Sequence, residues 1–87
     1  MKKIVLDCAQ MTGKKALHDY LAQKLELPFY YGHNLDALYD CLTEIKPCCI
    51  TFLHISELKA LGDYGQSLLN VFQDAALENK NLQIEPE

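Results

Sequence analysis

The chain has 87 residues, of which 49% are hydrophobic and 23% are charged, and its formal net charge at pH 7 is −4. This length supports one modest hydrophobic core, so we expect a single domain over residues 1–87. The acidic balance argues against nonspecific nucleic-acid binding and favours a basic protein partner.

The hydrophobic runs bear on the location of the protein. The first residues, Met1-Lys2-Lys3, are followed by only a short apolar stretch before Asp7, which is too little for the core of a signal peptide. No run is long enough to cross a membrane. We therefore expect a cytoplasmic protein whose cysteines are reduced.

The first part of the chain predicts a strand and a helix. Residues Lys3 to Asp7 alternate in the pattern of a short strand. After a turn, Thr12 or Gly13 is expected to cap a helix that runs to about Glu26. His18 lies beside the apolar stripe of this helix, where a histidine is usually a structural residue. Pro28 cannot continue the helix, and a tyrosine-rich loop follows it.

The next helix has two unlike faces. Asn34 is a strong N-cap residue, and we expect a helix from about Leu35 to Thr43. One side carries leucine and isoleucine at three- and four-residue steps, which predicts that this side faces the core. The opposite side carries three carboxylates at four-residue steps, with no lysine or arginine in the helix to neutralise them. We call these carboxylates the acidic row: Asp36, Asp40 and Glu44.

The acidic row has two interpretations. Acidic helix faces are most often only solvated. A docking surface for a cationic partner is the alternative, and it is favoured by the missing counter-charge and by the tyrosines nearby. These are Tyr30, Tyr31 and Tyr39.

The apolar run from Cys48 to Ile55 predicts the most buried strand, with His54 as a hydrogen-bonded strand residue. Ser56 is then expected to cap a short helical segment that reaches Leu61, and Gly62 to end it.

The C-terminal part predicts a helix and a strand. Asp63 is expected to cap a helix from about Tyr64 to Asn79, because Gln66 stands three residues later in capping-box position. Leu82 to Glu85 is expected to form a last strand, ended by Pro86.

Strands that alternate with helices predict an α/β fold with a parallel sheet. The outward residues of the first and last strands are partly polar, so we expect three to four helices mainly on one face of the sheet. Right-handed crossovers on that face give the strand order 1-2-3.

No nucleotide-binding, phosphate-binding or nucleophile motif is present. The three histidines lack metal-ligand spacing, and the four cysteines match no zinc template, so we expect most of the cysteines to be small buried hydrophobes. Asp36 and Asp40 lack further oxygen ligands for a divalent ion. We therefore expect no enzyme activity, no cofactor and no metal. A thiol- or metal-responsive role of Cys48 and Cys49 is a minor alternative.

The central stretch resembles a known family. The pattern L-P-x-Y-Y-G-x-N-L-D-A-L-x-D-C-L-T, from Leu27 to Thr43, is similar to the signature of the barstar family, the intracellular inhibitors of the bacterial ribonuclease barnase. The similarity extends over nearly the whole chain. It implies a three-stranded parallel sheet with helices, and a non-catalytic inhibitor that binds a basic extracellular-type ribonuclease one to one.

The resemblance also implies roles for particular residues. Asp40 would take the place of a substrate phosphate, Asp36 would meet a basic group at the rim, and Tyr30 would pack beside the catalytic histidine of the enzyme. Glu44 would add charge to the same face, and Asp74 would add a carboxylate from the last long helix. The remaining contact residues would be Asn34, Leu35, Tyr39 and Thr43.

The chain departs from the family pattern at several of these positions. Tyr39 stands where members often have tryptophan, and His33 replaces an acid. The best-known member has Gly-Trp in place of Glu44-Ile45 and a glutamate in place of Asp74. These departures bear on which partner is bound. The alternative function is an interaction module for another basic partner, without nuclease inhibition.

Overall fold

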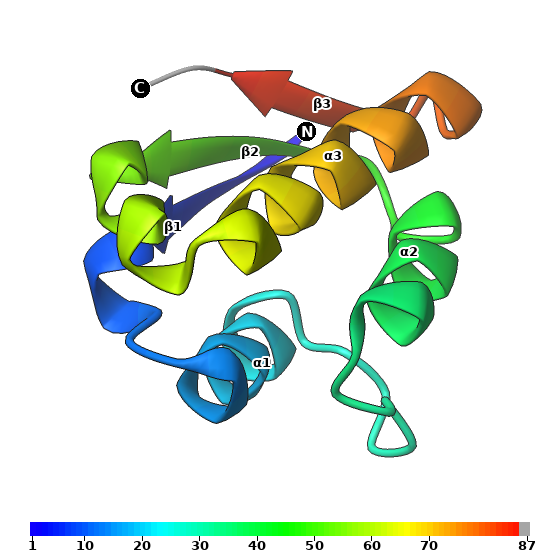
Figure 1. Ribbon diagram of the computed structural model, residues 1–87. Coiled ribbons are helices and arrows are strands. Elements are labelled where there is room, and N and C mark those ends of the chain that lie inside the picture. The colour runs from blue at the N-terminus through cyan, green and yellow to red at the C-terminus, as the bar shows by residue number, and fades with distance from the viewer. Residues whose placement is uncertain (86–87) are drawn as a thin grey trace.

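Three parallel strands form one sheet in the order β1-β2-β3 (Figure 1). The computed structural model describes residues 1–85. Ile4 of β1 lies beside Ile50 of β2, which lies beside Ile84 of β3. The α/β class and the strand order are as predicted, while Pro86 lies outside the described residues. The strands are β1 (Lys2–Asp7), β2 (Cys48–Leu53) and β3 (Leu82–Glu85).

The helices lie on one side of this sheet (Figure 1). Ile4, Leu6, Ile50 and Phe52 face them and are buried, because side chains on a strand alternate between its two faces. Val5, on the opposite face, is exposed. The helices are α1 (Lys14–Lys24), α2 (Leu35–Thr43) and α3 (Asp63–Glu78), with 3₁₀ segments η1 (Cys8–Gln10) and η2 (Ile55–Leu61). Within residues 1–85, none of them combines the length and the apolar character needed to cross a membrane.

Helix α1 ends two residues earlier than the sequence predicts. Leu25 is its C-cap, and Glu26 adopts the left-handed conformation with φ of 54°. The Leu27 N–H then donates to the Ala22 carbonyl at 3.0 Å, which closes the end of the helix. Pro28 follows and directs the chain into the loop that precedes α2.

Helix α2 is held against α3 by a buried amide. Asn79, the C-cap of α3, donates from Nδ2 to the carbonyl of Leu42 at 2.9 Å and to that of Ile45 at 3.3 Å. The Leu42 carbonyl lies in the last turn of α2 and the Ile45 carbonyl lies just beyond the helix, where backbone acceptors lack helical partners. The C-terminal end of α2 is therefore fixed by a side chain from the neighbouring helix.

The strand assignment of His54 is wrong. Strand β2 ends at Leu53, and His54 adopts a left-handed conformation with φ of 55° as the N-cap of η2. It is hydrogen-bonded as expected, because its Nδ1 lies 2.9 Å from Oδ1 of Asp7. Ser56 lies inside η2 and is not its cap, since the turn out of β2 is made two residues earlier.

The capping box at Asp63 is also wrong. Gly62 ends η2 as predicted, but it is at the same time the N-cap of α3, so Asp63 is already helical. Gly62 has φ of 62°, which glycine adopts without steric cost. Gly62 alone therefore separates η2 from α3. The Gln66 side chain does not cap the helix in the predicted way and donates to Oδ1 of Asn70 at 3.0 Å.

Candidate functional site

The acidic row lies on the outer side of α2. The predicted cap is confirmed, because Asn34 Oδ1 accepts the N–H of Ala37 at 2.7 Å. The inner side of the helix is buried through Leu38 and Leu42. All three carboxylate residues of the acidic row are exposed.

The acidic row has no ion-pair partner in the part of the chain that the structure describes. The ion pairs within residues 1–85 all join other side chains, so none of them involves Asp36, Asp40 or Glu44. The hydroxyl of Thr43 donates to the backbone carbonyl of Asp40 at 2.8 Å and leaves the Asp40 carboxylate free. Like charges one helical turn apart destabilise a helix slightly, so this arrangement has a small cost in the free protein.

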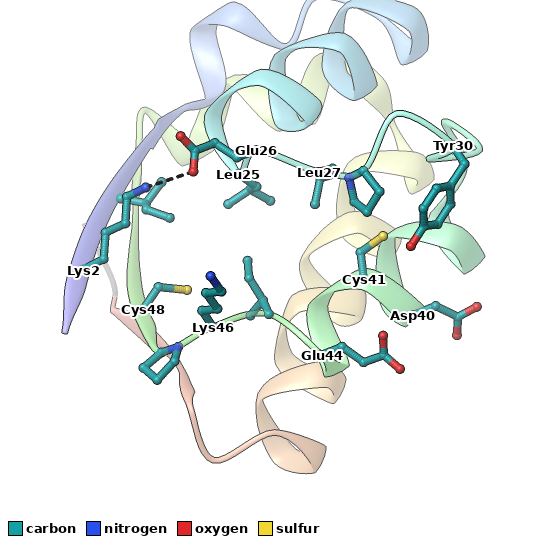
Figure 2. Close-up of a pocket in the computed structure, with 14 residues that line it drawn as sticks. Lys2, Leu25, Glu26, Leu27, Tyr30, Asp40, Cys41, Glu44, Lys46 and Cys48 are labelled. Atoms are coloured by element: carbon teal, nitrogen blue, oxygen red, sulfur yellow. Dashed lines mark hydrogen bonds and ion pairs between the residues drawn. The ribbon is translucent and has the colours of Figure 1, made fainter.

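A groove runs beside the row. It has a volume of about 470 Å³ and lies between the end of α1, the loop after it, α2 and the first residues of β1 and β2. Figure 2 shows Tyr30, Asp40 and Glu44 along one side and the Lys2–Glu26 pair on the opposite side. Its walls are largely apolar and include Ile4, Leu25, Leu27, Cys41, Ile45 and Cys48.

The structure brings together only some of the predicted contact residues. Tyr30, Asp40 and Glu44 share the groove, whereas Asp36 lies one turn away on α2 and does not line it. Asp74 is exposed on α3, which packs against α2, and it does not line the groove either. The other predicted residues of the helix region lie on or next to α2 and are exposed or partly buried: Asn34, Leu35, Tyr39 and Thr43.

A buried histidine supports the loop before α2. His18 is only 1% exposed, which confirms a structural position, and its Nδ1 lies 2.6 Å from the Tyr31 hydroxyl. Its Nε2 lies 2.6 Å from the hydroxyl of Tyr64 on α3. Burial lowers the pKa of His18, and the nearby His33 lowers it further. These two hydrogen bonds, which form the Tyr31–His18–Tyr64 network, connect the loop to α1 and α3.

This hydrogen-bond network was not predicted from the sequence. Tyr31 and Tyr64 are 13 and 46 residues from His18, so no local spacing could connect them. Burial raises the pKa of both tyrosines, so their hydroxyls stay protonated and available as donors. The only sequence signal was the position of His18 beside an apolar stripe.

The cysteines are buried or partly buried. Cys8, Cys48 and Cys49 are buried and Cys41 is intermediate, and no disulfide joins any of the four. Burial is the main cause that raises the pKa of Cys41, Cys48 and Cys49. Such thiols are poor nucleophiles and poor metal ligands at neutral pH. Within residues 1–85, no group of three or more histidine, cysteine or acidic side chains is placed to hold a metal ion.

The fold and the exposed helix define a small α/β protein whose distinctive surface is an unneutralised acidic row beside an apolar groove. Residues 1–86 match the family model described as Barstar (barnase inhibitor), and the chain belongs to this family. It is also 42% identical over 84 residues to the protein named "Putative ribonuclease inhibitor YrdF" of Bacillus subtilis (strain 168). That alignment covers 93% of this chain and 92% of the relative, so the similarity spans nearly the full length of both.

Proposed function

We propose that this protein inhibits a small, basic, barnase-like ribonuclease and has no catalytic activity of its own. The observation that carries the proposal is the exposed acidic row, which has no ion-pair partner within residues 1–85 and lies on helix α2 of a barstar-family fold. The name of the 42% identical relative, "Putative ribonuclease inhibitor YrdF", supports the same class of function.

The charge of the acidic row suits the active site of a ribonuclease. Such a site holds RNA phosphates, so it is cationic and concave. Carboxylates on a rigid helix supply negative charge in that cleft and offer no phosphodiester bond to cleave. Opposite charges also speed the encounter and fix the orientation of the two proteins.

We assign the central role to Asp40, which takes the place of a substrate phosphate. Tyr30 and Glu44 contact the enzyme beside it, because they line the same groove. Asp36 meets a basic group at the rim of the cleft, and Asp74 adds a carboxylate from α3. The surrounding contacts come from Asn34, Leu35, Tyr39 and Thr43.

The proposal includes the state of the partners. The free inhibitor is a monomer in the cytoplasm and binds one ribonuclease molecule. It makes no direct contact with nucleic acid, because its net charge of −4 repels phosphates. Inside the producing cell it protects RNA from an enzyme that acts elsewhere.

Titration of the protein into a ribonuclease assay with barnase tests the proposal. The wild-type protein should abolish activity at one equivalent. Asp40→Ala should raise the inhibition constant at least about 30-fold, since truncating one member of a desolvated charge pair costs about 2 kcal/mol or more. Glu57→Ala removes the same charge from exposed η2 and is the matched control, with inhibition unchanged.

Two outcomes would contradict the proposal: no inhibition by the wild-type protein, or equal potency of the Asp40→Ala and Glu57→Ala variants. The alternative is a module that binds another basic protein. Affinity capture from the source cell separates the two functions, because the identity of the bound protein decides between them.

A further inference from the structure

An aromatic side chain next to the proposed contact surface has no role so far. Phe29 is 99% exposed, and Tyr30, the following residue, is 75% exposed. Removing a phenylalanine side chain from water is favourable, so a ring this exposed adds to affinity when a partner covers it. We call Phe29 and Tyr30 the aromatic tip.

The aromatic tip has a defined geometry in the free protein. The two rings meet edge to face, with centroids 5.6 Å apart and planes at 83°. The Tyr31 N–H donates to the Pro28 carbonyl at 2.9 Å, which closes a turn beneath the rings. Tyr31 itself is only 5% exposed and contacts His18 at 2.6 Å, so the base of the loop is anchored in the core.

The aromatic tip is continuous with the acidic surface. Tyr30 lines the groove together with Asp40 and Glu44, so one of the two rings already belongs to the proposed interface (Figure 2). The loop between α1 and α2 projects from the body of the protein (Figure 1). A molecule that covers Asp40 and Tyr30 therefore approaches Phe29, which precedes Tyr30 in the loop and whose ring contacts the Tyr30 ring.

We propose that Phe29 is an apolar anchor that packs onto a flat, apolar surface of the ribonuclease beside its cationic cleft. The inference rests on the proposed function. A site that holds RNA must accommodate bases as well as phosphates, and bases bind by stacking on apolar and aromatic side chains. The acidic row matches the phosphate-binding part of such a cleft, and Phe29 matches the neighbouring apolar part.

A single exposed hydrophobic residue is common on protein surfaces and by itself indicates no partner. Leu77 on α3 is such a residue, at 84% exposure. It differs from Phe29 because it does not lie on the loop, where Phe29 stands between Pro28 and Tyr30, two residues that line the groove. It therefore provides a control of nearly equal exposure for the loss of a large apolar side chain.

The test compares Phe29→Ala, Phe29→Leu and Leu77→Ala for binding to barnase by calorimetry and stopped-flow kinetics. We expect Phe29→Ala to raise Kd tenfold or more through faster dissociation, with an association rate within twofold of wild type. The Kd of Phe29→Leu should lie between those of wild type and Phe29→Ala, and the Kd of Leu77→Ala should equal that of wild type. The thermal midpoints of both Phe29 variants should be unchanged, because the exposed ring does not stabilise the free fold.

The outcomes separate the two proposals. If the wild-type protein binds barnase and Phe29→Ala binds with the same Kd, the anchor is overturned and ribonuclease inhibition stands. If Leu77→Ala weakens binding as much as Phe29→Ala does, the anchor is also overturned. If the wild-type protein does not bind barnase, both proposals fail.

Discussion

His18 Nδ1 and the hydroxyl of Tyr31 lie 2.6 Å apart in the interior of the protein, and this contact joins α1 to the loop that carries the aromatic tip. A neutral imidazole donates from one ring nitrogen and accepts at the other. It therefore donates to one of the two hydroxyls, of Tyr31 and Tyr64, and accepts a hydrogen bond from the other. A protonated ring would require both tyrosines to accept. Both arrangements satisfy the ring nitrogens, but burial penalises the charged ring, so the neutral form of His18 is favoured in the folded protein.

The free energy of unfolding should decrease as pH falls below about 6.5. The folded pKa of His18 is lowered from its ordinary value of 6.5, mainly by burial. At pH values between the folded and the unfolded pKa of His18, the unfolded chain binds more protons than the folded protein. The free energy of unfolding is therefore larger at higher pH and decreases as pH falls. Urea denaturation between pH 7.5 and 5 measures the change.

His18→Gln is the variant that isolates this group, because it removes the titration and keeps a polar side chain. It should be less stable than wild type at pH 7.5 but should show a flatter pH profile between 7 and 5. If the free energy of unfolding of His18→Gln depends on pH as steeply as that of wild type, the pH dependence arises from other groups.

The cap of α2 should be worth about 1 kcal/mol. Asn34 Oδ1 accepts the N–H of Ala37 at 2.7 Å, and loss of a capping side chain costs about 0.5–2 kcal/mol. Asn34→Ala should therefore lower the midpoint of thermal unfolding by several degrees. Asn34→Asp keeps a capping oxygen and should stay within about 0.5 kcal/mol of wild type. Equal losses in both variants would contradict a capping role.

Gly65 should tolerate no side chain. A Cβ at this position would lie 2.4 Å from the carbonyl oxygen of Leu58, where η2 packs against α3. Overpacking of this kind costs about 1–3 kcal/mol, more than alanine gains from its helix propensity. We expect Gly65→Ala to lower the urea midpoint clearly. The control is Gly13→Ala, whose Cβ has nothing within 4 Å and which should cost less than about 1 kcal/mol.

The sequence predicted elements wherever local chemistry decides the structure. Asn34 identified the start of α2, and the spacing of Leu38 and Leu42 identified its buried side. The polar alternation of β1 and β3 indicated that one face of the sheet is open. Each of these signals lies within a few residues of the feature it predicts.

Predictions failed where a residue has two local options or a distant partner. Asp63 is a good cap residue, but Gly62 precedes it and already serves as the cap. His54 continues an apolar run, yet the chain turns there and brings it to Asp7, 47 residues away. The groove beside the acidic row is formed by segments that meet only in the folded protein, so its outline could not be read from spacing.

Association with a ribonuclease should slow steeply as salt concentration rises. The acidic row is exposed and has no ion-pair partner among residues 1–85, so its field reaches the solvent. Salt shortens the screening length from about 10 Å at 0.1 M to about 3 Å at 1 M. Stopped-flow rates with barnase at increasing salt measure the slope, which Asp40→Ala should reduce and Glu57→Ala should reduce less. A rate independent of salt would remove electrostatic steering from the proposed mechanism.

The thiols should react slowly in the native protein. Burial raises the pKa of Cys41, Cys48 and Cys49, so little thiolate is present at neutral pH. Cys41 is the most accessible of the four and lines the groove, so it should be modified first. Titration with a thiol reagent at pH 7, with and without urea, measures the rates. Rapid modification of Cys48 or Cys49 without urea would contradict their burial and favour the thiol-responsive alternative. Modification only after unfolding would show that both thiols are shielded in the folded protein.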